Sequence, residues 1–277
     1  MNAYLRLMRC HQPVGIFLLL WPTLIALWVG SSGIPNGKML SVFTLGVIVM
    51  RAAGCVINDC TDVRFDRHVA RTQVRPLAAG EITRREALLV LVGLLSLALM
   101  LLLCLPMRAW PYGAGALILT AVYPWMKRVV SFPQLILGIA FAFSIPMVFI
   151  SIQNTLPVTS GLLFLATVLW TIAYDTLYAK SDREDDLKIG VKSTAILFGK
   201  WDNAAALMMQ MMALVLFVIV GTMLSVRPLF YIGMGLAVLS TIYQSYLLRV
   251  KKQHFRAFLN NVWWGGFVFL AFVLGFL

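Results

Sequence analysis

Long uncharged apolar runs are the feature that most constrains how this chain can fold. They include residues 87–107, 203–226, 228–248 and 257–277, and each has the roughly 20 residues that an α-helix needs to cross the hydrocarbon of a bilayer. Charged residues make up 12% of the chain, whereas soluble domains contain about 25%. Because the runs lack the alternation of apolar and polar residues that marks barrel strands, the sequence predicts an all-α, multi-pass membrane protein.

Nine membrane-spanning helices are expected, in a single domain that covers residues 1–277. The division is least obvious in residues 129–174, which are uncharged and too long for one helix. We expect a break at the polar segment 151–157, where Pro157 would interrupt a helix. The centres of the expected spans lie near Leu20, Val47, Leu97, Leu117, Ala142, Leu169, Leu214, Leu236 and Phe269.

Basic residues mark alternate loops between these spans. Most of the 23 lysines and arginines lie in the N-terminal segment and in residues 64–85, 127–128, 180–200 and 249–256. Since such residues accumulate on the cytoplasmic side of a membrane, we expect the N-terminus on that side and the C-terminus on the other. This topology accounts for the net charge of +12. No nucleic-acid partner is expected, because a chain with so many spans offers little soluble surface.

All eleven carboxylates lie in two windows, residues 59–86 and 175–202, both at the expected cytoplasmic side. In the first window, Asn58, Asp62 and Asp66 follow one another at intervals of four, so they share one helix face, with Asp59 beside them. Carboxylates on one face repel one another unless a cation lies between them. Their oxygens suit Mg²⁺, which is commonly bound by one or two carboxylates plus substrate phosphates. The other interpretation is a solvated loop neutralised by its six arginines.

The second window repeats the pattern, with Asp175, Asp182 and Asp186 at positions i, i+7 and i+11 of a helix. Two such clusters in the only acidic regions of the chain favour cation binding over solvated loops. The remaining acids are expected to be solvated loop charges, and they include Glu81, Glu86, Glu184 and Asp202.

Two ionisable residues are expected inside the membrane-spanning helices, and such residues are functional candidates. Asp175 lies near the end of the sixth span, and it could instead form an ion pair with Lys180 or Arg183. Arg51 lies seven residues, or two helical turns, before Asn58, so it should face the same cleft at greater depth. A guanidinium matches a planar carboxylate in bidentate fashion. Spacing alone equally allows a structural ion pair between Arg51 and Asp175.

Basic segments accompany both acidic windows. They are residues 71–77, residues 123–128, and Lys188 with Lys192. Metal ions alone would not need these side chains, but a phosphorylated substrate would. Carboxylates, Mg²⁺ and basic side chains together form a site for a diphosphate, whose departure the cations would assist by neutralising the developing charge. At the mouth of a helical bundle, such a site suits a substrate with a polar head and a lipid tail.

At these residues the chain resembles the UbiA family of intramembrane prenyltransferases, in particular its bacterial members that act on 4-hydroxybenzoate. The resemblance implies a nine-helix bundle in the bacterial inner membrane, in contact with membrane lipid. Its cavity would open to the cytoplasm, where Mg²⁺ holds the diphosphate of a polyprenyl diphosphate donor. The matching segments run over almost the whole chain and are residues 9–15, 18–23, 50–59, 65–66, 75–77, 123–128, 144–147, 174–176 and 185–199.

The resemblance also implies roles for individual residues. Loss of diphosphate would leave an allylic cation, which the ring carbon ortho to the phenol of 4-hydroxybenzoate would attack, on the route to ubiquinone. Arg51 would hold the benzoate carboxylate. The catalytic set is Asp62, Asp66, Asp182, Asp186 and Arg51. The metal ligands are Asn58, Asp59, Asp62, Asp66, Asp175, Asp182 and Asp186. The substrate-binding residues are Arg51, Arg75, Tyr123, Lys127, Arg128, Tyr178 and Lys192.

The chain departs from the family pattern at two positions. Gln12 stands where many members have Lys, so any charge role is absent there. Cys60 follows Asp59 where many members have an aromatic residue, which would alter acceptor packing without touching the metal ligands.

Other functions fit the sequence less well. The acceptor could be homogentisate or a naphthoate. CDP-alcohol phosphotransferases also use clustered aspartates, but they require one continuous motif that this chain lacks. A cation transporter could use paired acids, but it would not need eleven of them beside arginines suited to phosphate.

Overall fold

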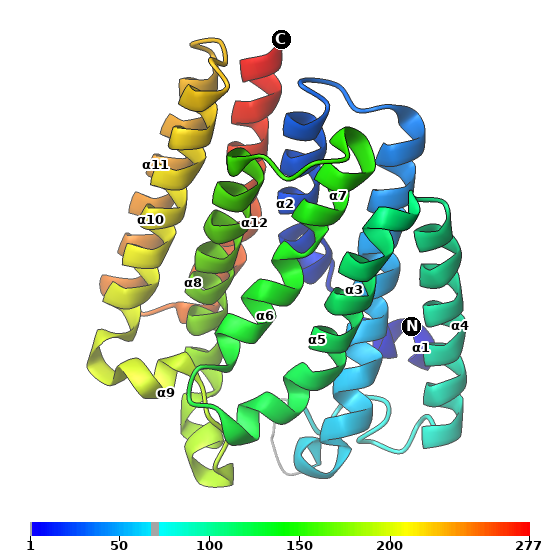
Figure 1. The fold of residues 1–277 in the computed structure, drawn as a ribbon. Helices are drawn as coiled ribbons and strands as arrows, with labels where there is room; N and C mark the ends of the chain where they lie inside the picture. Colours follow the sequence, from blue (N-terminus) through cyan, green and yellow to red (C-terminus); the bar gives the residue numbers. More distant parts are fainter. Residues whose placement is uncertain (1, 68–71) are drawn as a thin grey trace.

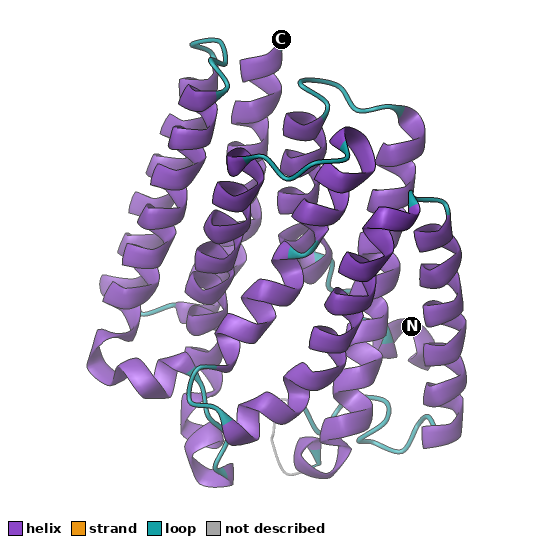
Figure 2. Ribbon diagram, in the orientation of Figure 1, coloured by secondary structure: helices purple, strands orange, loops and turns teal. Residues whose placement is uncertain are grey.

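The computed structural model describes residues 2–67 and 72–277, and within these ranges the chain is entirely helical, without strands (Figures 1 and 2). The all-α prediction is therefore confirmed. Arg71 lies outside the described residues, as do the side chains of Phe65 and Asp185. The elements are α1 (Ala3–Leu7), α2 (Val14–Gly30), α3 (Gly37–Asp66), α4 (Arg84–Leu103), η1 (Met107–Ala109), α5 (Trp110–Val129), α6 (Pro133–Ala142), α7 (Ser144–Gln153), α8 (Val158–Ile189), α9 (Thr194–Phe198), η2 (Gly199–Trp201), α10 (Asp202–Met223), α11 (Phe230–Arg249) and α12 (His254–Phe276).

Within the described ranges, seven segments are long and apolar enough to cross a membrane, where the sequence predicted nine. The chain is therefore a multi-pass membrane protein. Helices α2 and α5 occupy the other two expected positions. Of these, α2 has only 17 residues, and α5 carries prolines, tyrosines and two basic residues that lower its hydropathy. The seven segments are Gly37–Val63, Arg84–Leu103, Pro133–Gln153, Val158–Glu184, Thr194–Met223, Phe230–Arg249 and His254–Phe276.

The expected break in residues 129–174 is present, and a second one was not predicted. Helix α7 ends at Gln153, and Asn154 in the left-handed conformation (φ 58°) closes it before α8 begins at Val158. The unpredicted break lies at Phe143, between α6 and α7. Pro146 explains it, because proline lacks an N–H and its ring clashes with the carbonyl four residues earlier.

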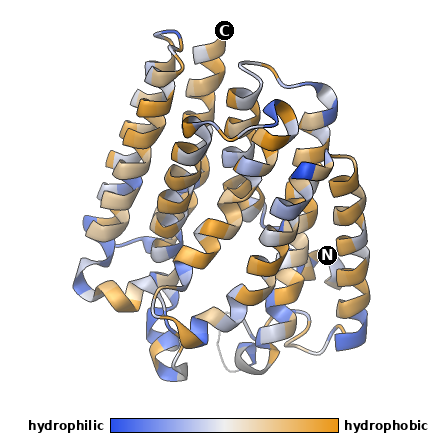
Figure 3. Cartoon of the chain, viewed as in Figure 1, coloured by the Kyte–Doolittle hydropathy of each residue, from blue (hydrophilic) through white to orange (hydrophobic). Residues whose placement is uncertain are grey.

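Two helices are much longer than the membrane needs. Helices α3 and α8 have 30 and 32 residues, which corresponds to about 45 and 48 Å at a rise of ~1.5 Å per residue. The hydrocarbon core is only about 30 Å thick, so each helix can extend beyond it. Their C-terminal ends lie at the same end of the bundle, the lower end in Figure 1, where Figure 3 shows hydrophilic residues gathered. This arrangement brings the two acidic windows together.

Helix α8 lies at the centre of the bundle, where it contacts α6, α10 and α12. The fully buried rings of Trp170 and Trp264 pack against each other at a tilt of 40°, with centroids 4.9 Å apart. Glycines permit close approach, as is usual between membrane helices. A Cβ at Gly265 would lie 2.3 Å from the Trp170 ring, and one at Gly233 would lie 2.5 Å from the backbone of Ala271. By contrast, α4 packs along α3 and barely touches α5.

Candidate functional site

A cavity of about 1060 Å³ runs between α2, α3, α4, α5, α6 and α8. Its polar end is lined by acids of both windows and by basic residues beside them: Asp62, Asp66, Asp175, Asp182, Asp186, Arg75, Lys127, Arg128 and Lys192. Its apolar end is lined by α4 leucines, by the first half of α5 and by the N-terminal half of α3. The volume is at the upper limit for small-molecule sites. A cavity with a charged end and an apolar arm suits a ligand of matching character.

One face of α3 forms a continuous wall of this cavity. The lining residues recur every three or four positions, as one face of a helix requires. The expected sharing of a face by Asn58, Asp62 and Asp66 is therefore observed, and Arg51 lies on the same face, nearer the apolar arm. The full set is Val42, Phe43, Gly46, Val47, Met50, Arg51, Gly54, Cys55, Asn58, Asp62 and Asp66.

Helix α8 contributes a second wall. Asp175, Tyr178, Asp182 and Asp186 all line the cavity, and their spacing of three, four and four residues puts them on one helix face. The cavity-lining acids of the two windows, which are more than a hundred residues apart in sequence, therefore meet around one space. Two separate sequence clusters make one site.

Asp59 occupies a different environment from the other acids of its window. Its side chain is 1% exposed, and it does not line the cavity. Its Oδ1 accepts hydrogen bonds from Arg9 at 2.6 Å and from Arg75 at 3.2 Å, while Oδ2 is buried without a hydrogen-bond partner among the described residues. In this structure Asp59 thus anchors two arginines beside the cavity.

Arg75 also reaches the first acidic row. Its Nη1 donates to Asp66 Oδ2 at 2.7 Å. Burial raises the pKa of Asp66 above its ordinary value, although the charge of Arg75 and its hydrogen bond act in the opposite direction. Asp66 and Asp59 therefore share one arginine, which lines the cavity between them and the N-terminal segment.

The end of α5 places two further basic residues against the same row. Arg128 Nη2 donates to Asp62 Oδ1 at 2.9 Å. Lys127 Nζ lies 3.4 Å from Asn58 Oδ1 and 4.9 Å from the centre of the Tyr123 ring. Arg75, Lys127 and Arg128 are thus each next to an expected metal ligand. Such charge-assisted pairs are stronger than neutral hydrogen bonds.

Lys192 is held at the cavity by the segment that precedes α9. Its backbone N–H donates to the Lys127 carbonyl at 2.8 Å, and its Nζ donates to the Val129 carbonyl at 2.8 Å. Next to it, the backbone N–H of Thr194 donates to Oε1 of the buried Gln134 at 3.0 Å. These contacts fasten the segment to α5 and α6, so the lysine stays at the rim.

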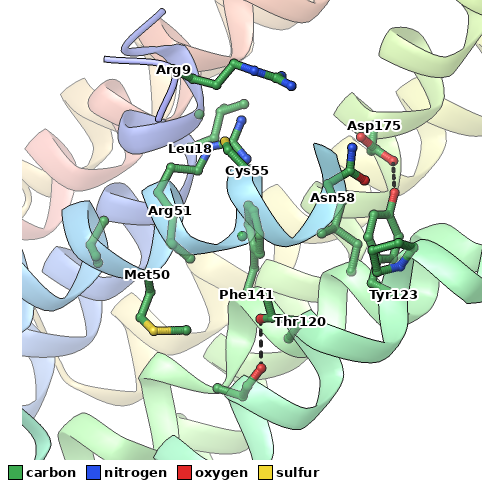
Figure 4. Close-up of a pocket in the computed structure, with 18 of the residues that line it drawn as sticks. Arg9, Leu18, Met50, Arg51, Cys55, Asn58, Thr120, Tyr123, Phe141 and Asp175 are labelled. Carbon is green, nitrogen blue, oxygen red and sulfur yellow. Dashed lines mark hydrogen bonds between the residues drawn. The ribbon is translucent and has the colours of Figure 1, made fainter. Parts of the chain in front are cut away.

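Asp175 lines the cavity from α8, and the hydroxyl of Tyr123 donates to its Oδ2 at 3.5 Å (Figure 4). The alternative pairing with Lys180 or Arg183 is not formed, because both of these pair with Asp202, at 2.6 and 3.5 Å. Tyr123 and Asp175 therefore form a polar pair inside the cavity, without a basic partner from their own window.

The prediction that Asp202 is a solvated loop charge was wrong. Its side chain is 1% exposed. Helix α10 packs closely against α8, which brings the first residue of α10 between Lys180 and Arg183. A buried carboxylate requires such partners. Glu81 and Glu86 are exposed, as expected, and Glu86 completes a capping box with Thr83 at the start of α4.

Arg51 is the basic residue deepest along the α3 wall, and Figure 4 shows it on the same part of the wall as Cys55. Within the described residues its guanidinium makes no hydrogen bond or ion pair, so the alternative ion pair with Asp175 is not formed. It lies instead against Gly15 of α2. Its donors are therefore available to a ligand in the cavity.

Sequence reasoning did not single out Arg9, Gly15 or Gln134 as site residues. All three line the cavity. Arg9 and Gly15 fall within a segment that matched the family pattern, which was the one available signal. Gln134 stands in an uncharged stretch and carries no such signal, because its contact with residue 194 depends on how α6 packs against α8.

The residues at the polar end fit a divalent cation with a phosphorylated ligand. The candidate metal ligands are carboxylate and amide oxygens, which suit Mg²⁺. In the described part of the chain, no three histidine, cysteine or acidic side chains are close enough to hold a metal by themselves. Mg²⁺ commonly takes one or two carboxylates and completes its shell with water and substrate phosphates. The arrangement therefore agrees with a metal that binds together with its substrate.

Comparison with known proteins agrees with this geometry. The sequence model of the UbiA prenyltransferase family matches residues 19–266. A 4-hydroxybenzoate octaprenyltransferase of Tolumonas auensis is 48% identical over 99% of this chain and 96% of its own length. The enzyme of the same name from Hahella chejuensis is 47% identical over 99% of this chain and 92% of its own length.

Solved structures share the fold. The apo structure of a UbiA homolog from Aeropyrum pernix K1 superposes with a TM-score of 0.83 at 23% identity, over 95% of this chain and 98% of that one. A UbiA homolog from Archaeoglobus fulgidus, bound to GPP and Mg²⁺, gives a TM-score of 0.72 at 20% identity, over 98% and 99%. From the family match and the close relatives together, it follows that this chain belongs to the UbiA prenyltransferase family.

Proposed function

We propose that this chain transfers a polyprenyl group from polyprenyl diphosphate to carbon 3 of 4-hydroxybenzoate, with release of diphosphate, as a step of ubiquinone biosynthesis. The observation that carries the proposal is one cavity that joins two carboxylate rows, the basic residues beside them, Arg51, which has no hydrogen-bond partner among the described residues, and an apolar arm. The names of the close relatives support 4-hydroxybenzoate as the acceptor and a polyprenyl group as the group transferred.

The diphosphate of the donor is assigned to the polar end. Asp62 and Asp66 on α3 and Asp182 and Asp186 on α8 would hold Mg²⁺, with Asn58 and Asp175 beside them. When bound, the metal would neutralise the charge that develops on the departing diphosphate. The basic set for the phosphate oxygens is Arg75, Lys127, Arg128 and Lys192.

Pairing within the site suggests how the basic residues are kept in place. Arg75 contacts Asp66 and Arg128 contacts Asp62, at 2.7 and 2.9 Å. A cation that binds these carboxylates would weaken both pairs and release the guanidiniums toward phosphate oxygens. Asp59 keeps its place outside the cavity and would retain Arg75 at the rim.

The acceptor is assigned to Arg51, whose guanidinium would take the benzoate carboxylate in a bidentate pair. In the reaction, the bond between the first prenyl carbon and the diphosphate oxygen breaks. A new carbon–carbon bond forms to the ring carbon next to the phenol, and that carbon loses its proton. Tyr123 and Tyr178 also line the cavity and would pack beside the ring and the allylic group.

The tail of the donor is assigned to the apolar arm. This arm is lined by Val42, Gly46 and Val47 of α3 and by leucines of α4, of which Leu99 is exposed. The outer part of the tail would lie beside Leu99 on α4, which lines the arm and is exposed. The basic ends of the helices favour a location in the bacterial inner membrane with the polar end toward the cytoplasm.

The test uses membranes that contain the full chain, supplied with octaprenyl diphosphate, Mg²⁺ and either 4-hydroxybenzoate, homogentisate or a naphthoate. We expect 3-octaprenyl-4-hydroxybenzoate to form, and chelation of the metal to stop its formation. Preferential prenylation of another acceptor would overturn the assignment of the acceptor. Absence of any prenylated product, together with cation flux that depends on Asp62, would overturn the enzyme assignment.

A further inference from the structure

Gly15, the second residue of α2, lies in unusually close contact with Arg51. A Cβ at this position would be 2.1 Å from Arg51 Nε, 2.3 Å from Nη2 and 2.5 Å from Cζ. All three nearest atoms belong to the guanidinium, and its two nitrogens are nearer than its carbon, so the Nε/Nη2 edge of the group points at the glycine. No other residue type can occupy position 15 while the guanidinium keeps this place.

The contact lies at the cavity wall. Gly15 is buried, and both residues line the cavity. Arg51 comes from α3, which follows α2 in the chain and packs against it. With Gly15 against its Nε/Nη2 edge, the guanidinium lies close to α2, and the Nη1 side is left for a ligand in the cavity. Any side chain at position 15 would push it outward into the space assigned to the acceptor.

The end of an arginine side chain is flexible, so a side chain added at position 15 can displace the guanidinium without displacing the backbone. An added methyl group at position 15 would meet movable guanidinium atoms and no backbone. The helix can therefore keep its fold while the guanidinium moves. The expected consequence is a misplaced functional group in a folded protein.

We infer that Gly15 is a positioning residue for the acceptor: the absence of a side chain there lets the Arg51 guanidinium lie against α2, in the place from which it receives the acceptor's carboxylate. The inference rests on the proposed role of Arg51. It assigns to the N-terminal end of α2 a part in selecting an aromatic acid, although Gly15 itself touches no substrate.

The α2 helix offers a matched control. Gly30, at its other end, is also buried, but a Cβ there would meet Ile152 and Val148 side chains at 3.5 and 3.6 Å, which is ordinary contact. Both glycine-to-alanine changes alter the same helix. Only the change at position 15 should displace the guanidinium of Arg51.

The test compares G15A, G30A, R51A and the double variant G15A/R51A as full chains in membranes, with each substrate varied in turn. We expect G15A to lower kcat/KM for 4-hydroxybenzoate about 10- to 100-fold, as small misplacements of positioning groups do, and to leave the KM for octaprenyl diphosphate unchanged. G30A should match the parent. Since Gly15 acts through Arg51, the double variant should be no worse than R51A.

Each failure has a distinct meaning. Equal losses toward both substrates in G15A, or losses that multiply in the double variant, would overturn the role of Gly15. If R51A does not affect use of the benzoate, the proposed role of Arg51 fails, and the inference falls with it. If G15A fails to accumulate, G15A/R51A should restore its level because the clash is gone. Failure of both variants to accumulate would also overturn the inference.

Discussion

Two polar regions lie among the membrane helices, and they are built on opposite plans. The cavity between α3 and α8 gathers ionisable side chains around an open space. A second region, between α10, α11 and α12, consists of neutral side chains that are buried: Gln210, Ser240, Thr241, Gln244, Asn260 and Asn261. The comparison separates polar residues that bind ligands from polar residues that hold helices together.

The neutral region is closed on itself. Asn261 Nδ2 donates to Gln244 Oε1 at 3.1 Å, and Asn261 Oδ1 accepts from the Trp170 indole at 2.9 Å. Asn260 donates to the Ser240 carbonyl at 3.0 Å, and the Trp264 indole donates to Thr241 at 3.0 Å. These amides and hydroxyls find their partners within the protein. Such a network fixes the register of neighbouring helices.

The charged region is open by comparison. Within the described residues Arg51 has no hydrogen-bond partner, and Asp175 has a partner in Tyr123 at a distance of 3.5 Å. Charged groups at membrane depth are costly when unpaired, so their presence here requires a reason other than stability. Whether the protein itself completes the contacts of a polar side chain in a membrane helix therefore separates a ligand-binding role from a structural one.

The largest effect is expected from the carboxylate rows. Replacement of Asp62 by alanine should reduce prenyl transfer about 100- to 1000-fold, the usual cost of losing one group that stabilises developing charge, without loss of folded protein. The measurement is product formation per unit of folded enzyme in detergent. Asn261→Ala is the matched variant in the neutral region and should retain most activity. Comparable activity losses in both variants would erase the distinction between the regions.

The apolar arm should determine which donors are accepted. A Cβ at Gly46 would meet nothing within 4 Å, and this residue lies about 24 Å from Asp62 along α3, at ~1.5 Å per residue. Gly46→Phe should fill the arm and weaken use of octaprenyl diphosphate about 5- to 150-fold, equivalent to ~1–3 kcal/mol of overpacking. Geranyl diphosphate should be used as before.

Gly93 provides the control for this substitution. It is exposed on α4 and does not line the cavity, and a Cβ there would likewise meet nothing within 4 Å. Gly93→Phe should leave the relative rates with long and short donors unchanged. If the Gly46→Phe enzyme uses the long and the short donor as the parent does, the assignment of the donor tail to this arm is wrong.

A substitution of Asp202 tests whether the role of an acid follows from its position in an acidic window of the sequence or from the residues that it contacts. It belongs to the second acidic window, but it is buried with Lys180 and Arg183. Asp202→Asn should destabilise the protein by about 3 kcal/mol, because removal of one partner leaves buried charge uncompensated. The kcat of the folded fraction should hardly change. Thermal unfolding in detergent and activity per folded molecule measure the two effects, and a loss of kcat with normal stability would place Asp202 with the cavity acids.

The sequence predicted what depends on spacing along one helix, and it failed where packing between helices decides. The shared face of Asn58, Asp62 and Asp66 follows from their intervals of four. The exclusion of Asp59 from the cavity does not, because Arg9 and Arg75 cover it from the N-terminal segment and the loop after α3. Burial of Asp202 likewise depends on the docking of α10 against α8. The break at Phe143 could have been predicted, because Pro146 lies three residues after it in the sequence.

The smallest effect is expected in the neutral region, and it should appear in stability alone. Asn261→Ala removes the acceptor of the buried Trp170 indole and one donor to Gln244. Hydrogen bonds between membrane helices contribute about 1 kcal/mol, so the loss should be ~1–2 kcal/mol, seen as a lower unfolding temperature in detergent. Gln253→Ala, outside the network at the start of α12, should be neutral. If Asn261→Ala instead changed the KM of either substrate at unchanged stability, the closed network would be part of the substrate site, and the two regions would no longer be separate.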